Sequence, residues 1–216
     1  MSSSCFTPRR IMRRGRPHNP FSVQRTGPDG LEYMFAGGET AESVADEFER
    51  HGWTGELVGP CGVGKTTLLN TLAAEAARRG MSVIRWTCNS DNRRLPRGWR
   101  RELARAQVCF LDGAERCVPA DFRALRWACA RLGVGLVVTL HTPGFFHLSR
   151  RVTVAPEIFE RMVERLAAAG GCRVLPGLAM DLLARRNGCA REALADLYRA
   201  FEDGLLMDPS APSLFC

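Results

Sequence analysis

The chain has 216 residues, 30 basic and 23 acidic side chains, a formal net charge of +7 and 45% hydrophobic residues, which is the composition of a globular protein. The longest apolar run, from Gly133 to Leu140, is far shorter than the ~18 residues of a membrane-spanning helix, and no hydrophobic signal segment follows the N-terminus. We therefore expect neither a membrane protein nor a secreted one, but one core domain of roughly 150–170 residues with appendages.

The excess positive charge lies at the N-terminus. Residues 1–28 contain six arginines and no acid, whereas the rest of the chain has 24 basic and 23 acidic residues. Blocks of like charge are usually solvated, so residues 1–18 are predicted to form a basic, disordered arm. The alternative is that the arm contacts a nucleic-acid backbone or an acidic partner. A second arginine-rich run is predicted to line a solvated helix, and its members are Arg93, Arg94, Arg97, Arg100, Arg101 and Arg105.

Strand-like apolar runs alternate with helical patterns along the chain, which predicts an α/β fold with a parallel sheet. Strands are expected at residues 56–58, 83–87, 107–111, 134–140 and 151–154. Helices are expected at 40–50, after 65, at 98–105, at 119–132, from 156, at 178–186 and at 191–201. We divide the chain into the arm (1–18), a core with its N-terminal linker and helix (19–154), a small helical lid (155–203) and a flexible tail (204–216).

The first strand leads into the pattern G-x-x-x-x-G-K-[ST], the Walker A motif or P-loop. Its residues are Gly59, Pro60, Cys61, Gly62, Val63, Gly64, Lys65 and Thr66, followed by Thr67. The glycines let backbone N–H groups surround a phosphate, and the next helix directs its positive end at the same anion. Lys65, the only lysine in the chain, is expected to reach the β- and γ-phosphates, and Thr66 to ligate Mg²⁺.

Polar residues follow two later strands, where ligands of open α/β sheets bind. Asp112 ends the third strand and is expected to hold the Mg²⁺ shell. His141 follows the fourth strand after Thr139 and Leu140, and a role as γ-phosphate sensor competes with a simple solvent-facing histidine. A carboxylate near Asp112 could activate water, and Glu115 is the nearest acid along the chain.

In this order the three motifs resemble the additional-strand (ASCE) P-loop NTPases, and within them the AAA+ and STAND ATPases. The stretch from residue 19 to 53 is also similar to small bacterial P-loop ATP-binding proteins. The resemblance covers about residues 19–203 and implies a three-layer α/β fold with a parallel five-stranded sheet in the order 5-1-4-3-2. Gly188 to Arg191 is similar to the second-sensor motif G-x-x-R, which implies that Arg191 contacts the γ-phosphate from the lid. Ser149 to Arg151 resembles the box that supplies an arginine finger to a neighbouring subunit, which implies a role in trans for Arg150 or Arg151.

The chain departs from the AAA+ pattern at one position. Those proteins have a catalytic Glu directly after the Asp of the second motif, and this chain has Gly113 there. Glu115 is therefore assigned as general base, with Asp91 as the alternative.

These assignments predict an Mg²⁺-dependent ATPase that switches conformation with nucleotide state. Two alternatives stay open: a P-loop kinase acting on a small molecule, and a non-hydrolysing module that binds a partner when ATP is bound. The preference for ATP over GTP is implied by the resemblance. A protein partner or homo-oligomer would follow from the arginine finger.

Nine cysteines lack both CxxC pairs and zinc-ligand spacing. Several lie inside apolar runs, as at Cys109, where a thiol acts as a small hydrophobic group. This usage predicts a reducing, cytoplasmic location.

Overall fold

The computed structural model describes residues 18–27 and 30–203, so the predicted arm, apart from His18, and the predicted tail lie outside the described residues. Five parallel strands form one sheet in the order β2-β3-β4-β1-β5. The strands are β1 (Gly55–Val58), β2 (Val83–Thr87), β3 (Val108–Asp112), β4 (Gly135–Leu140) and β5 (Ser149–Arg151). This is the order 5-1-4-3-2 read from the other edge, and it confirms the predicted fold class.

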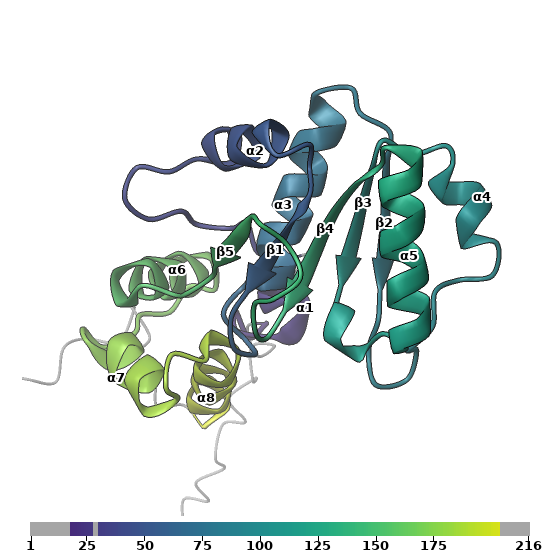
Figure 1. Ribbon diagram of the computed structural model, residues 1–216. Coiled ribbons are helices and arrows are strands. Elements are labelled where there is room, and N and C mark those ends of the chain that lie inside the picture. Colours follow the sequence, from purple (N-terminus) through teal and green to yellow (C-terminus); the bar gives the residue numbers. More distant parts are fainter. Residues whose placement is uncertain (1–17, 28–29, 204–216) are drawn as a thin grey trace, which may run out of the picture.

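Helices cover both faces of the sheet and build a separate layer at its side (Figure 1). Their bounds are α1 (Val23–Thr26), α2 (Ala41–Arg50), α3 (Lys65–Arg78), α4 (Trp99–Leu103), η1 (Ala114–Arg116), α5 (Pro119–Leu132), α6 (Pro156–Ala169), α7 (Leu178–Arg185) and α8 (Ala190–Glu202). None of these helices of the described ranges is long and apolar enough to cross a membrane.

Side-chain alternation along the strands separates two cores. In β3, Val108 and Phe110 are fully buried against α2 and α3, whereas Cys109 and Leu111 are fully buried on the α5 side. Successive strand residues point to opposite faces, so a strand buried on both faces reads as a continuous apolar run. This is why the sequence predicted the central strands well.

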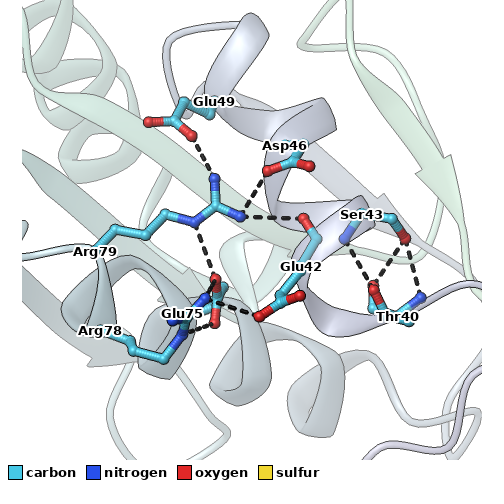
Figure 2. Close-up of polar contacts among 8 residues, drawn as sticks. All are labelled: Thr40, Glu42, Ser43, Asp46, Glu49, Glu75, Arg78 and Arg79. Atoms are coloured by element: carbon cyan, nitrogen blue, oxygen red, sulfur yellow. Dashed lines mark hydrogen bonds and ion pairs between the residues drawn. The ribbon is translucent and has the colours of Figure 1, made fainter.

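Ion pairs join α2 to α3 on one face of the sheet (Figure 2). Buried Glu75 accepts from Arg78 at 2.8 Å and from Arg79 at 3.0 Å, and Arg79 also pairs with Asp46 at 2.7 Å and with Glu49. The hydrogen bonds from Arg78 are the main cause that lowers the pKa of Glu75 to about 2. These contacts fix α2 on α3, the helix that begins at the P-loop lysine.

A third apolar cluster is built mainly by α6, α7 and α8, and Phe21 and Leu31 of the N-terminal segment pack into it. Phe21, 2% exposed, packs with these helices, and the side chain of Asn19 donates to Tyr198 O (3.0 Å) and Glu202 Oε1 (2.9 Å) on α8. The start of the described chain is therefore attached to the three C-terminal helices. The division into core and lid remains a prediction.

The observed elements differ from the predicted ones mainly at β5. We predicted a strand at 151–154, and the structure forms it at Ser149–Arg151, in register with Glu56–Val58 of β1. Two valines of the predicted strand lie outside the observed one and pack in the apolar clusters. Val152 is buried in the cluster that contains Leu57 of β1, and Val154 lies against two apolar clusters. The short helix α1 was not predicted, because four residues carry too little periodicity.

Candidate functional site

The loop between β1 and α3 has the backbone that a phosphate-binding loop requires. Gly62 and Gly64 adopt φ values of +79° and +92°, which side chains disfavour. A Cβ at Gly62 would lie 2.5 Å from the sulfur of Cys189, so the loop also lies directly against the start of α8. Gly64 is the N-cap residue of α3, whose first N–H groups are therefore available to an anion.

Lys65 points back across its own loop. Its ammonium donates to Gly59 O at 2.7 Å and to Pro60 O at 2.8 Å, and the residue is 8% exposed. Burial lowers the pKa of Lys65, while the carboxylates of Glu115 and Asp112 act in the opposite direction. The ammonium group is thus held against the loop by two backbone carbonyl groups.

Thr66, Asp112 and Thr139 form one hydrogen-bonded chain across three elements. The Thr66 hydroxyl is 3.1 and 3.0 Å from the two carboxylate oxygens of Asp112. The Thr139 hydroxyl donates to Asp112 Oδ1 at 2.7 Å and accepts from Gly113 N at 2.7 Å. Asp112 and Thr66, predicted from positions 46 residues apart, are therefore in contact.

Glu115 and His141 also meet. Glu115 Oε1 on η1 lies 3.4 Å from His141 Nε2 at the end of β4 and 4.0 Å from Arg116 Nε. Both residues line the cavity that contains the P-loop. The turn of η1 after Gly113 (φ +71°) brings Glu115 back to the strand ends, although it lies three residues after Asp112.

The cavity next to the P-loop has a volume of about 730 Å³ and is bounded by β-strand ends, by the N-terminal segment and by α6 and α8. Arg191, the second residue of α8, reaches over the P-loop, and its guanidinium lies 3.5 Å from the Cys61 sulfur. The side facing α6 is apolar and includes Ile158 and Met162. A cavity that is polar beside the P-loop and apolar beside α6 suits a ligand with an anionic group at one end and a ring at the other.

The sequence matches no protein-family model and no curated protein. Solved structures do match the fold. A DNA replication initiation factor aligns with 15% identity and a TM-score of 0.57 over 80% of this chain and 63% of that one. The replication initiator DnaA bound to AMPPCP and single-stranded DNA aligns with 15% identity and a TM-score of 0.55 over 82% and 65%. AMPPCP-bound DnaA from Aquifex aeolicus aligns with 14% identity and a TM-score of 0.57 over 83% and 66%.

The chain shares the α/β fold of these solved structures. At 14–15% identity the likeness shows the fold alone, and the chain spans just under two thirds of the length of each of these proteins.

One predicted residue of the AAA+ pattern lies away from the cavity. The guanidinium of Arg150, on β5, donates to Glu47 Oε2 at 3.0 Å and to Glu39 Oε1 at 2.6 Å. Burial is the largest influence on the pKa of Arg150, but the two carboxylates outweigh it and raise that pKa. Arg151 is exposed on the same short strand. Asp91 is exposed as well and does not line the cavity.

The residues present fit a magnesium ion. The Thr66 hydroxyl and the Asp112 carboxylate are hard oxygen donors, lie side by side and line the cavity. They belong to different elements, the first turn of α3 and the tip of β3, which the sheet register holds together.

Many cavity-lining residues were not predicted as site residues, and Tyr33, Arg116, Tyr198 and Arg199 are among them. Tyr33 lies beside the P-loop, because a Cβ at Gly64 would be 3.5 Å from its ring. No local sequence pattern marks Tyr33, Tyr198 or Arg199, because these residues lie far from the P-loop along the chain. Thr139 did carry a signal, a hydroxyl near the tip of an apolar strand.

Proposed function

We propose that the protein binds ATP with Mg²⁺ and hydrolyses it, using the nucleotide as a conformational switch. The observation that carries this proposal is the meeting of Lys65, Thr66, Asp112 and Glu115 at one edge of the sheet, beneath Arg191 of α8. The fold that the chain shares with two structures of AMPPCP-bound DnaA also supports the proposal.

In this proposal each group has one task. Lys65 exchanges its loop carbonyls for the β- and γ-phosphate oxygens, and the loop N–H groups hold the same anion. Thr66 and Asp112 hold Mg²⁺, which neutralises charge on the phosphates when bound. Glu115 accepts a proton from the attacking water, and His141 orients that carboxylate and senses the γ-phosphate.

The switch would act through the contact between the P-loop and α8. Cys189 and Arg191 lie against Gly62 and Cys61, so a γ-phosphate in the loop changes what Arg191 contacts. We propose that Arg191 pairs with this phosphate before hydrolysis and returns to the Cys61 sulfur afterwards. Arg150 would act on a neighbouring subunit only after leaving Glu39 and Glu47.

Phosphate release tests the proposal with two variants. Lys65→Ala should abolish both ATP binding and turnover. Glu115→Gln should keep binding and lower turnover by about 10²-fold or more, because it removes only the proton acceptor. Asp91→Asn serves as the matched control and should turn over ATP as the unaltered protein does. Undiminished turnover by Lys65→Ala would refute the assignment.

The products separate the alternatives. ADP with free phosphate supports an ATPase, whereas ADP with a phosphorylated small molecule would identify a kinase. Nucleotide that raises the melting temperature without turnover would identify a non-hydrolysing module. Running ATP and GTP in parallel settles the base preference.

Single-stranded DNA is the second candidate partner. One of the solved initiators with this fold is bound to it. In this chain the segment before and within α4 carries exposed arginines, and the Arg100 guanidinium stacks 4.5 Å from the Trp99 ring. Aromatic and cationic groups together suit unpaired bases and phosphates.

Binding of a labelled oligo(dT) tests this second candidate. Arg100→Glu with Arg101→Glu should weaken binding and lower its salt dependence, and Arg165→Glu on α6 is the exposed control. If only deletion of residues 1–18 abolishes binding, the basic arm and not α4 is responsible.

We also infer a cytoplasmic location. Five of the seven described cysteines are buried as free thiols, and burial raises the pKa of Cys88 and Cys129 to about 12. Such thiols are suited to a reducing compartment. A fluorescent fusion with and without residues 1–18 would test this inference.

A further inference from the structure

The connection from β4 to β5 lacks the helix that a parallel crossover usually carries. It consists of residues 141–148, all of them described, and none is helical. Parallel strands normally need a crossover of a dozen or more residues, usually a helix that covers the sheet. In Figure 1 this connection passes in front of β1 as a loop without a helix. On the α5 face of the sheet, β1 is therefore covered by this connection and not by a crossover helix.

The connection is held firmly in this position. Glu56 on β1 is fully buried, and its two carboxylate oxygens accept from Gly144 N and Phe145 N, both at 3.1 Å. Arg126 on α5 donates to Phe145 O at 3.2 Å and lies 5.3 Å from the rings of Phe145 and Phe146. A charge-assisted network of this kind is stable only when every group is paired. The connection is thus a fixed feature of the fold.

A groove of about 510 Å³ remains between α5, the start of β4 and this connection. Its apolar lining includes Val134, Leu136 and Phe146. Trp127 stands at its side and is 67% exposed, and Phe145 nearby is 46% exposed. An indole left in water beside an apolar groove is typical of a binding surface and not of a core.

The charge around the groove has one sign. Its lining contains Arg123 and Arg126 and no acidic residue. Glu56, the nearby buried carboxylate, is already satisfied by two backbone N–H groups. The basic residues 1–28 of the same chain would be repelled, so an occupant must bring acidic groups as well as an apolar face.

We propose that this groove binds an amphipathic helix of a partner protein, which occupies the place of the missing crossover helix. The apolar face of that helix packs on Trp127 and Phe146, and acidic residues beside this face pair with Arg123 and Arg126. Trp and Arg are the side chains that most often dominate such interfaces. The groove lies apart from the P-loop cavity and shares no lining residue with it, so the proposal does not depend on nucleotide turnover.

Two synthetic helical peptides of about 18 residues test the proposal on the full chain. They share one Leu/Phe face and differ only in Glu or Lys at the flanking positions. Anisotropy of the labelled peptides should show that the Glu peptide binds roughly tenfold more tightly than the Lys peptide. Arg123→Glu should remove or reverse this preference, and Trp127→Ala should weaken the Glu peptide roughly tenfold. Arg131→Glu, exposed on the same helix but outside the groove, should bind as the unaltered chain does.

Other results would overturn the proposal. Absence of binding, equal binding of both peptides, or an effect of Arg131→Glu equal to that of Arg123→Glu would each do so. Self-association in sedimentation that Trp127→Ala abolishes would assign the groove to a second copy of the chain. Oligo(dT) binding that needs both Trp127 and Arg123 would assign it to nucleic acid. Unchanged melting temperatures and ATP binding in the variants would show that the fold and the nucleotide site are intact.

Discussion

Thr139 shows how a single hydroxyl can organise a site. It donates to Asp112 and accepts from Gly113 N, both at 2.7 Å, and it is 1% exposed. Asp112 therefore has a fixed orientation toward Thr66 before any ligand arrives. Because the hydrogen bonds of the Thr139 hydroxyl are made to Asp112 and Gly113, we regard Thr139 as a positioning residue.

Thr139→Val should keep the shape of the side chain and lose both hydrogen bonds. We expect a stability loss of about 1–2 kcal/mol, because Gly113 N–H is left without its partner. The Mg²⁺ concentration that supports half-maximal ATP turnover should rise, since Asp112 loses a fixed orientation. Thr139→Ser should restore the metal dependence, and a purely structural role for Thr139 would leave that dependence unchanged in both variants.

Single residues were predicted where local sequence defines their place. Lys65 and Thr66 belong to one contiguous motif, and Asp112 ends an apolar strand. The positions of these three residues could therefore be predicted from local sequence alone. Tyr33 could not be found in this way, because it reaches Gly64 from a loop 31 residues earlier. The pairing of Arg150 with Glu39 and Glu47 was likewise invisible, since it depends on how β5 lies against α2.

At the scale of elements, the α2–α3 ion pairs should give the protein a measurable pH dependence. The pKa of Glu75 is lowered from an ordinary value of 4.5 to about 2. A carboxylate with a lowered pKa in the folded state stabilises the fold fully above its unfolded value and loses this effect as the pH falls through the folded value. The stabilisation by Glu75 is therefore present at pH 5 and above, and fades as the pH approaches 2.

Urea unfolding of Glu75→Gln across this pH range checks the expectation. At pH 7 the variant should lose about 1–2 kcal/mol of unfolding free energy, a value reduced for the solvent around Arg78. The difference from the unaltered protein should shrink as the pH falls below about 4.5. Glu42→Gln, an exposed partner of the same arginine, should change little. Equal losses in the two variants would contradict the role of Glu75.

Elements were predicted best where local sequence decides them. The bounds of β2 and α5 match the predicted ones, because β-branched and aromatic residues define β2 and a proline-to-glycine helix defines α5. Strand β5 was misplaced because its position depends on pairing with β1 and not on its own residues. The early start of β5 follows from the helix-free connection after β4. Because this connection is short, the chain already pairs with β1 at Ser149, two residues before the predicted start of the strand.

For the whole molecule, the N-terminal segment connects the helices α6–α8 to the sheet. Phe21 is buried among these helices, whereas Tyr33 and Phe35 pack against the core that contains α2 and α3. Their rings contact each other edge-on with centroids 4.8 Å apart. The cavity lies between the two ends of this segment, so a ligand there would contact both packed bodies.

Phe21→Ala should therefore loosen the helices α6–α8 without altering the P-loop itself. We expect a loss of about 3 kcal/mol in the stability of this helical layer, because a fully buried ring is removed from its core. Hydrogen exchange should accelerate in α6–α8 and stay slow in α3, and ATP affinity should fall, since Arg191 would be held less firmly over the loop. Gln24→Ala, at an exposed residue of the same segment that does not line the cavity, is the control and should change neither quantity. Equal acceleration in α3 and α8 would instead mean that the chain opens as one unit, and that the N-terminal segment stabilises the whole fold at once.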